Sequence, residues 1–325
     1  MNDSFARQVD YLRISITDRC NERCLYCMPQ GYKGWQRTQD HLTADEIVRI
    51  VGVAARLGFR KFRLTGGEPL LRNDIVEIVA GMKAIPGVET IGLSTNGTKL
   101  STLAGPLRAA GMRTANVSLD ALDPKIYRTV TGGDVESVFA GIRAAIAAGY
   151  ERVKLNCVLM RGVNEQEIWP LVMYAAEQEL PLRFIELMPL TRTDVLTEKK
   201  FLPVGEAMQR IEEHDELIPQ PETKIGHGPA KYFRLKRTDA LVGFIGALTN
   251  LHFCESCNKM RLTADGKIRP CLGDHGEIDL RPALNHADQE TQLHEKFLEA
   301  LRKKPLEHLF RTQYQPLRPM TAIGG

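Results

Sequence analysis

Short apolar runs alternate with helical stretches from residue 11 to about residue 190, and this alternation limits the possible folds most strongly. Each run mixes β-branched and apolar residues, as strands buried beneath helices do. The six runs recur about every 30 residues and are LRISIT (12–17), KFRLTG (61–66), TIGLST (90–95), TANVSLD (114–120), RVKLNCVLM (152–160) and LRFIELM (182–188). Six β/α units in succession predict a parallel sheet.

The stretches between these runs have the signals of helices. LTADEIVRIVGVAARLG opens with Thr43 and Glu46, the residues of a capping box. VESVFAGIRAAIAAG and NEQEIWPLVMYAAEQ are amphipathic, and we expect Pro170 to kink or delay the second helix. A closed (β/α)8 barrel needs two more units, which the chain after residue 190 does not clearly supply. The sequence therefore predicts an α/β fold, a partial (β/α)6 barrel of TIM type.

The regular alternation stops after Met188. A polar, loop-rich stretch follows with one helix expected near residues 204–213, then a strand in LVGFIGALT (241–249) and a helix over 288–303. The tail PLRPMTAIGG is expected to be extended and mobile. We place the boundary between a core domain and a C-terminal domain so that the two span residues 1–235 and 236–325.

Charge and hydropathy exclude several classes of protein. The 325 residues contain 43 Lys and Arg against 40 Asp and Glu, so the sequence argues against non-specific nucleic-acid binding. The first residues, MNDSFARQVDYL, lack the apolar core of a signal peptide, and no apolar run of eighteen residues follows. We expect a cytoplasmic protein, or an organellar one without its transit peptide, with no membrane partner.

The seven cysteines fall into groups of three, one and three. In a cytosolic protein, clustered cysteines are more often metal ligands or catalytic groups than disulfides. An odd total divided in this way suits two three-thiolate sites plus a buried, inert thiol. The groups are Cys20, Cys24 and Cys27, then Cys157, then Cys254, Cys257 and Cys271.

The first group, in TDRCNERCLYCMPQ, follows the first predicted strand with the spacing C-x3-C-x2-C. Barrel-type sheets place their chemistry at this end of the strands. A structural zinc site needs four ligands, and the nearest histidine, His41, is expected at the surface. Iron–sulfur clusters take one thiolate per iron, so three thiolates on a four-iron cluster would leave one iron free for a small molecule.

This cysteine loop resembles that of the radical S-adenosylmethionine (SAM) superfamily, and the resemblance extends over about residues 11 to 190. It implies a [4Fe–4S] cluster whose fourth iron binds SAM and whose electron cleaves SAM to a 5′-deoxyadenosyl radical. Tyr26 occupies the aromatic position of the loop. LTGGEP (64–69) resembles the glycine-rich strand end of the superfamily, where Gly66 and Gly67 let the backbone approach the SAM ammonium and Glu68 adds an acceptor.

Two later strand ends would complete SAM binding by the same resemblance, through Ser118 and Met188. Without the resemblance these residues read as a strand-end hydroxyl and a packing methionine.

The second cysteine group has the spacing C-x2-C-x13-C. C-x2-C is also common in zinc sites, and His252 or His275 could supply a fourth ligand. Spacing alone therefore leaves zinc and iron–sulfur equally open.

The radical SAM core, the second triad and the terminal Gly-Gly together resemble the GTP 3′,8-cyclase family of molybdenum-cofactor biosynthesis, over nearly the whole chain. The resemblance implies a second [4Fe–4S] cluster that contacts the guanine of GTP, in a C-terminal domain that closes the barrel mouth. It implies formation of (8S)-3′,8-cyclo-7,8-dihydroguanosine 5′-triphosphate after abstraction of hydrogen from C3′ of GTP. It also implies an electron donor, cyclic pyranopterin monophosphate synthase as the next enzyme, and a monomer or homodimer.

The same resemblance assigns substrate and tail residues. The triphosphate needs cationic partners, for which arginine is suited. The family commonly has Arg where this chain has Lys259, and Thr where it has Ser94. The resemblance implies that the tail enters the active site with Gly324 and Gly325, and that Arg318 moves with it; otherwise these residues are a disordered end. The implied substrate-binding residues are Arg13, Arg63, Ser94, Lys154, Lys259, Met260 and Arg261.

Two other functions fit parts of the sequence. A radical SAM peptide-maturation enzyme would also have C-terminal cysteines, but such enzymes usually have more of them and a peptide-recognition domain before the core. A non-enzymatic zinc scaffold would use the cysteines alone. Iron and sulfide analysis separates the scaffold from the enzymes.

Overall fold

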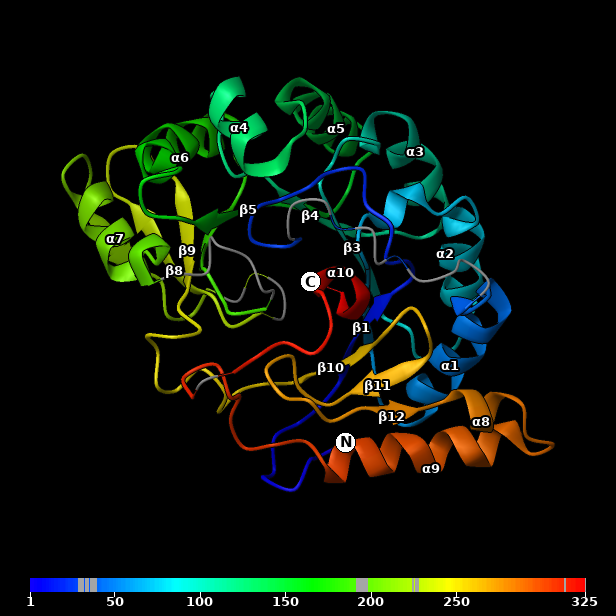
Figure 1. Ribbon diagram of the computed structural model, residues 1–325. Helices are drawn as coiled ribbons and strands as arrows, with labels where there is room; N and C mark the ends of the chain where they lie inside the picture. The colour runs from blue at the N-terminus through cyan, green and yellow to red at the C-terminus, as the bar shows by residue number, and fades with distance from the viewer. Residues whose placement is uncertain are drawn as a thin grey trace.

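The computed structural model describes residues 1–28, 32, 35, 40–190, 198–223, 225, 228–312 and 314–324. A curved sheet surrounds the C-terminal segment, and helices cover its outer face (Figure 1). Six strands pair in chain order, each parallel to the next, and all six predicted strands are confirmed to within two residues at their ends. They are β1 (Tyr11–Ser15), β2 (Lys61–Thr65), β3 (Thr90–Thr95), β4 (Thr114–Ser118), β5 (Arg152–Leu159) and β6 (Leu182–Glu186).

Helices connect these strands and pack on the outside of the sheet (Figure 1). The predicted capping box is present, since Thr43 Oγ1 accepts from Glu46 N at 3.2 Å and Glu46 Oε2 accepts from Thr43 N at 2.7 Å. Pro170 lies in the first turn of its helix, where its missing N–H removes no helical hydrogen bond. The helices are α1 (Ala44–Arg56), α2 (Ile75–Lys83), α3 (Leu100–Ala110), α4 (Pro124–Thr131), α5 (Val135–Ala147) and α6 (Ile168–Glu177).

Two strands from the C-terminal region extend the parallel sheet at both edges. β9 (Leu241–Ile245) pairs in parallel with β6, and β10 (Lys259–Leu262) pairs in parallel with β1. Among the described strands β9 and β10 do not pair with each other, so the barrel is partial, as predicted. Antiparallel strands continue each edge, namely β8 (Lys231–Leu235) and β7 (Leu217–Pro219) beyond β9, and β11 (Lys267–Arg269) and β12 (Ile278–Asp279) beyond β10.

The remaining elements are two longer helices after residue 190 and several short helical segments. α7 (Val204–Glu212) and α9 (Gln289–Arg302) confirm the two helices predicted after residue 190. No helix in the described ranges is long and apolar enough to cross a membrane. The short elements are α8 (Arg281–Leu284) and the 3-10 turns η2 (Pro69–Leu71), η3 (Glu165–Glu167) and η4 (Glu198–Lys200).

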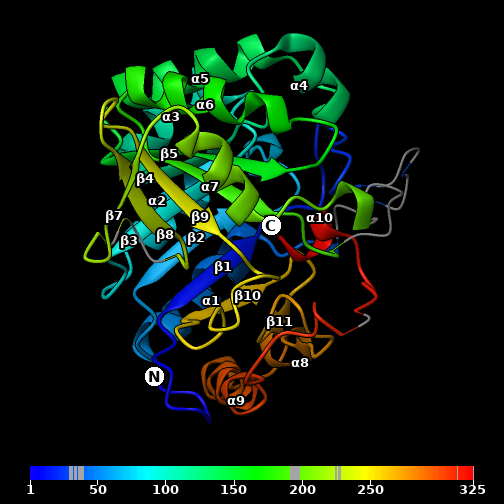
Figure 2. The same ribbon diagram turned by 90° about the vertical axis from the view of Figure 1, so that its left-hand side faces the viewer.

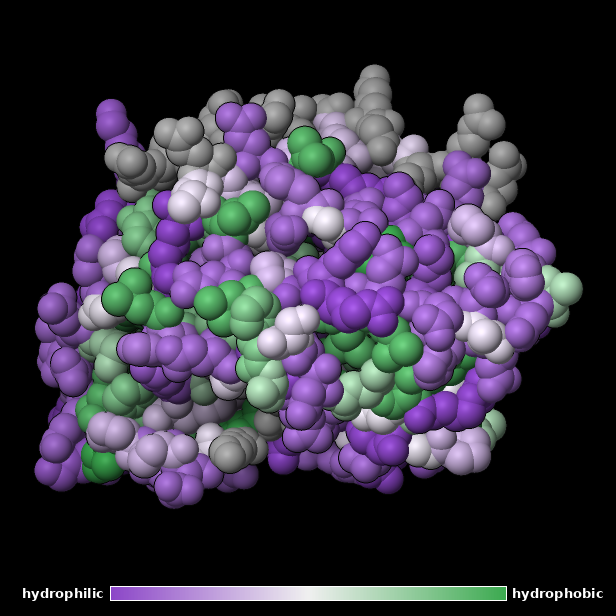
Figure 3. Space-filling model, turned by 90° about the horizontal axis from the view of Figure 1, so that it is seen from below, coloured by the Kyte–Doolittle hydropathy of each residue, from purple (hydrophilic) through white to green (hydrophobic). Residues whose placement is uncertain are grey.

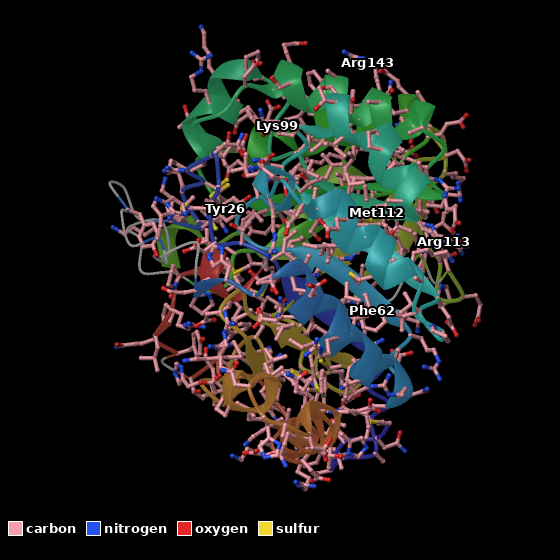
Figure 4. The ribbon with its side chains drawn as sticks, turned by 90° about the vertical axis from the view of Figure 1, so that its right-hand side faces the viewer. Tyr26, Phe62, Lys99, Met112, Arg113 and Arg143 are labelled. Carbon is pink, nitrogen blue, oxygen red and sulfur yellow. The ribbon has the colours of Figure 1, made fainter. Side chains whose placement is uncertain are left out.

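The two faces of the sheet differ in chemistry. Leu12, Phe62 and Met260 lie side by side in register and belong to the hydrophobic core, and Figure 4 shows Phe62 on the side covered by α1 and α2. Side chains alternate along a strand. The neighbouring Arg13 and Arg63 therefore face the interior of the barrel.

The C-terminal tail is not extended, so that expectation is wrong. It forms α10 (Met320–Ile323) inside the curve of the sheet (Figures 1 and 2). Thr321, Ala322 and Ile323 are buried. A single helical turn has too few residues to show apolar periodicity, and small side chains suit a narrow interior.

Candidate active site

The first cysteine triad lies after β1, at the carboxyl ends of the parallel strands. Figure 4 shows Tyr26 from this loop on the same side as α10, whereas Met112 and Arg113, which precede β4, lie on the opposite side. Cys27 N and Met28 N both donate to Cys24 O, at 3.0 and 3.1 Å, which closes a tight turn.

Three half-buried thiols on one loop fit a cluster with one thiolate per iron. Burial raises the pKa of Cys20 and of Cys27 to about 12, and it raises the pKa of Cys24 well above its usual range. The metal-free thiols are therefore neutral, and binding of a metal would release their protons.

Hydrogen bonds attach the cysteine loop to α4 and β4. Arg23 N donates to Thr131 O at 2.7 Å, and Tyr127 OH donates to Glu22 Oε1 at 2.8 Å. Tyr26 OH donates to Asp120 Oδ2 at 2.8 Å, just after β4. These hydrogen bonds fix the cysteine loop at the carboxyl ends of the parallel strands. The contact of Tyr26 with SAM stays a prediction.

The glycine-rich end of β2 packs directly against the residues that follow β1. A Cβ atom on Gly66 would lie 2.3 Å from Thr17 O, and one on Gly67 would lie 2.3 Å from Arg19 O. Only glycine allows this approach. Gly67 N also donates to Thr17 O at 2.9 Å.

Glu68 ties β2 to β3. Its carboxylate accepts from Leu70 N at 3.0 Å, Thr95 Oγ1 at 2.7 Å and Asn96 N at 2.7 Å, and burial raises its pKa to about 7. Glu68 therefore holds the carboxyl end of β2, next to Gly67, against the end of β3.

Ser118 and Met188 lie at two further strand ends. Ser118 ends β4 and is half-buried. Met188 follows β6 and packs against the hydrophobic cluster of Leu190, Phe310 and Tyr314. A part in SAM binding stays a prediction for both.

Three predicted arginines form a row across adjacent strands. Arg13 on β1 lies opposite Arg261 on β10 and Arg63 on β2. The Arg63 guanidinium donates to Tyr11 OH, Leu93 O and Thr114 Oγ1. These three arginine side chains lie next to one another on the inner face of the barrel.

Lys154 and Arg183 extend this cationic surface. Lys154 Nζ donates to Ile225 O at 3.1 Å, and Arg183 Nε donates to Asn156 Oδ1 at 2.9 Å. Arg183, on β6 opposite Asn156, was missed by the sequence analysis, although it alternates with the apolar Leu182 and Phe184.

No carboxylate within the described ranges forms an ion pair with these cations. Burial, with the repulsion of neighbouring arginines, lowers the pKa of Arg13 to about 10, that of Arg261 to about 9 and that of Lys154 to about 6. Buried charge of one sign without a partner is costly unless an anion binds there. The inner face is therefore a candidate anion site, made of Arg13, Arg63, Lys154, Arg183, Lys259 and Arg261.

The remaining predicted substrate residues differ in position. Lys259 Nζ lies 5.7 Å from the centre of the Tyr11 ring and donates to Asn258 Oδ1 at 3.2 Å. Ser94 is half-buried opposite Asn116. Met260 is fully buried in the outer hydrophobic core, so its side chain does not share the face of Arg261, and only its main chain is available to a substrate.

The second cysteine triad comes from two segments beside β10. Cys254 and Cys257 precede this strand, with Cys257 N donating to Cys254 O at 3.1 Å, and Cys271 follows β11. All three are free and half-buried. Burial raises the pKa of Cys254 and Cys271, whereas for Cys257 the positive charges of Lys304 and Lys259 outweigh burial and lower the pKa.

The histidines near this triad have other partners. His252 Nδ1 lies 2.6 Å from Glu255 Oε1, and the His275 ring stacks on Tyr314 with centroids 4.8 Å apart. Over the described ranges, no three His, Cys, Asp or Glu side chains gather around a position for a single metal ion.

The tail reaches the strand ends of β1 and β2. A Cβ atom on Gly324 would lie 2.8 Å from Thr65 Cγ2 and 3.0 Å from Ser15 Cβ, and Arg261 Nη1 donates to Gly324 O. Arg318 forms ion pairs with Asp265 and Glu277. Gly325 lies outside the described residues.

Two other sequence expectations have clear outcomes. His41 is buried rather than at the surface, because its Nε2 lies 3.1 Å from Asp18 Oδ1 beside the cysteine loop. Cys157 is buried within β5, as predicted.

Comparison with known proteins identifies the class of this arrangement. Residues 14–175 match the radical SAM superfamily, and residues 180–310 match the family described as Molybdenum Cofactor Synthesis C. The crystal structure of Streptococcus suis SuiB bound to S-adenosylmethionine has the same fold, with a TM-score of 0.65, 15% identity, and coverage of 94% of this chain and 68% of that chain. The fold and the three-cysteine loop are those of a radical SAM protein, which uses SAM and an iron–sulfur cluster.

Full-length relatives define the family more narrowly. The GTP 3′,8-cyclase of Moorella thermoacetica is 46% identical over 326 residues, covering 100% of both chains. The GTP 3′,8-cyclase of Pelotomaculum thermopropionicum is 40% identical, and the match covers 100% of both chains. That of Pseudomonas entomophila is 41% identical, and the match covers 99% of this chain and 97% of the relative. This chain belongs to the GTP 3′,8-cyclase family.

Proposed function

We propose that this protein converts GTP to (8S)-3′,8-cyclo-7,8-dihydroguanosine 5′-triphosphate, an early step of molybdenum-cofactor biosynthesis. The observation that carries the proposal is the inner face of the barrel, where six buried or half-buried basic residues face the interior and none forms an ion pair with a carboxylate in the described ranges. A triphosphate supplies the missing negative charge. The same interior opens toward the first cysteine triad and Gly324.

The first cysteine triad, on the core region over residues 1–235, would hold a [4Fe–4S] cluster. Tyr26 on the cysteine loop, with Gly67, Ser118 and Met188 after or at the ends of β2, β4 and β6, would bind SAM. When bound, the cluster and SAM would supply a 5′-deoxyadenosyl radical able to take the hydrogen atom from C3′ of GTP. Bonding of the C3′ radical to C8 of guanine would leave an unpaired electron on the purine, so one electron from a donor and one proton would complete the 7,8-dihydro product. The chain's own residues position the ribose and exclude water.

The second triad, in residues 236–325, would hold another [4Fe–4S] cluster. It adjoins β10, whose Lys259 and Arg261 belong to the cationic face. A cluster at the second triad would contact the guanine of GTP. Arg13, Arg63 and Lys154 would bind its phosphates. Ser94 and the main chain of Met260 would complete this site.

The tail would act at the reacting end of the substrate. Gly324 is held by Arg261 between Ser15 and Thr65, where a side chain does not fit. We propose that Gly324 and Gly325 shape the site in which the carbon radical reacts, and so class them as catalytic.

GTP is the proposed substrate, and cyclic pyranopterin monophosphate synthase would use the product. An electron donor is required, and we propose a cytoplasmic monomer or homodimer. A peptide-maturation activity is less favoured, because an inner face with six basic residues suits a polyanion better than a peptide.

The test is anaerobic incubation of reconstituted protein with SAM, dithionite and GTP, followed by mass spectrometry of the nucleotide product. Iron and sulfide should each reach about eight per chain, as two four-iron clusters require. Absence of a cyclised nucleotide, with both clusters present and SAM cleaved, would refute the proposed reaction.

A further inference from the structure

Lys304 is a buried lysine next to the second cysteine triad. It lies just after α9 and is 2% exposed. Its ammonium donates to Lys259 O at 2.8 Å, to Pro270 O at 2.8 Å and to Cys257 Sγ at 3.4 Å. An ammonium has three N–H donors, so these three partners use all of them.

These contacts join the two separate segments that supply the triad. Cys257 and Lys259 belong to the segment that enters β10, whereas Pro270 directly precedes Cys271. One ammonium therefore fixes the spacing between the two parts of the site. The same group holds the first residue of β10, the strand of the cationic substrate face.

The charge of Lys304 needs an anion. Lysines are almost never fully buried unless paired. In the described part of the chain no carboxylate forms an ion pair with Lys304, and two of its three partners are neutral carbonyls. The third partner is a sulfur, and cysteine binds metals as the negatively charged thiolate.

We propose that Lys304 is a positioning residue of the second iron–sulfur site, where its ammonium hydrogen-bonds the Cys257 ligand and raises the reduction potential of the cluster. This inference rests on the proposed function, which places a cluster at the second triad. Reduction adds negative charge to a cluster, and a nearby cation stabilises the reduced form. Hydrogen bonds to cluster sulfurs and local net charge set such potentials.

The experiment isolates the second cluster in the full chain. Cys20→Ala, Cys24→Ala and Cys27→Ala together remove the first cluster, so a redox titration followed by electron paramagnetic resonance reports the second cluster alone. Adding Lys304→Met should move the midpoint to a more negative potential and lower the iron retained per chain. Lys304→Arg keeps the charge and should shift the midpoint less.

The matched control is the adjacent Lys303→Met. Lys303 Nζ lies 2.7 Å from Glu299 Oε1, and its side chain is 62% exposed. Lys303 directly follows α9. The face of the molecule seen from below is mainly hydrophilic, with scattered hydrophobic residues (Figure 3). This variant should leave both the midpoint and the iron content unchanged.

An unchanged midpoint in Lys304→Met would overturn the inference, while GTP conversion by the wild-type protein would leave the proposed function intact. If Lys304→Met does not fold, Lys304→Gln retains a donor without the charge, and it must still shift the midpoint negatively. Zinc in place of iron at the second triad would overturn both the inference and the two-cluster proposal.

Discussion

Lys154 lies on the inner face of β5, and burial together with Arg183 and Arg63 lowers its pKa to about 6 from its ordinary 10.5. Between these two values the unfolded chain binds more protons than the folded chain does. The stability of the GTP-free protein should therefore rise with pH across this window. A bound triphosphate favours the charged lysine and should draw a proton from solution.

We therefore predict proton uptake when GTP binds at pH 7.5. Calorimetry in buffers of different ionisation enthalpy should find about one proton fewer for Lys154→Met than for the wild type. Lys231→Met is the control, because Lys231 is exposed at the start of β8. Equal uptake by wild type and Lys154→Met would show that Lys154 does not face the triphosphate.

The family resemblance of the sequence indicated much of this candidate site but not all of it. Arg13, Arg63 and Lys154 stand on strands with the alternation that the sequence predicts. Arg183 and Lys304 look like ordinary surface cations in a sequence, and only the pairing of distant segments buries them. His41 is buried and not at the surface for the same reason, because the fold brings it to Asp18, which lies 23 positions earlier in the chain.

At the scale of elements, Gly92 on β3 leaves space for the side chain of Arg63 on the inner face of the barrel. A Cβ atom on Gly92 would lie 2.6 Å from Arg63 Nη2 and 2.7 Å from Thr114 Oγ1. Since Arg63 is held on three sides, it has little freedom to move. The absence of a side chain at Gly92 is thus part of the anion site.

Gly92→Ala should cost about 1–3 kcal/mol of unfolding free energy by overpacking. It should also weaken GTP binding by displacing Arg63. Gly205→Ala on α7 brings its new Cβ within 4 Å of nothing outside its neighbouring residues and should stabilise the chain by about 0.5–1 kcal/mol. Chemical denaturation and GTP titration check both, and a Gly92→Ala protein as stable as Gly205→Ala contradicts this packing.

The short helix α10 ends in Gly324 with φ of 75°. Gly324→Ala should therefore cost about 1–2 kcal/mol through the backbone alone. It should in addition suppress cyclised product, because the new methyl group meets Thr65 and Ser15. First-cluster iron and SAM cleavage should remain.

Gly149→Ala separates the two effects. Gly149 has a similar φ of 72°, yet nothing lies within 4 Å of its Cβ position. This variant should lose comparable stability and keep full product formation. If Gly324→Ala forms product as Gly149→Ala does, the tail has no part in the reaction.

Elements of the core were more predictable than those of the C-terminal region. The strands from β1 to β6 are short runs that mix β-branched and apolar residues, and each pairs with the next in sequence. β10 pairs with β1 across about 250 residues, and KMRL is too short and too polar to indicate a strand. α10 was missed because its stability comes from the interior that it enters.

At the scale of the whole molecule, the two cysteine triads lie at opposite ends of neighbouring parallel strands. The first follows the carboxyl end of β1, and the second lies before β10 and after β11, so each depends on its own segments. The two sites should therefore be separable by mutation.

Cys24→Ser should abolish release of 5′-deoxyadenosine, because the first site loses a ligand. Cys257→Ser should keep this release in uncoupled form and lose the cyclised nucleotide. Cys157→Ser changes a cysteine that belongs to neither triad and should retain both activities. Equal loss of iron from both sites in Cys257→Ser would contradict separate sites, or show that they fold together.

The central claim is that the interior holds GTP with its ribose C3′ beside the SAM-derived radical. GTP deuterated at C3′ tests this directly under anaerobic turnover with SAM and dithionite. We predict deuterium in the 5′-deoxyadenosine that is released together with cyclised nucleotide. Release of unlabelled 5′-deoxyadenosine alongside full product formation would contradict abstraction from C3′.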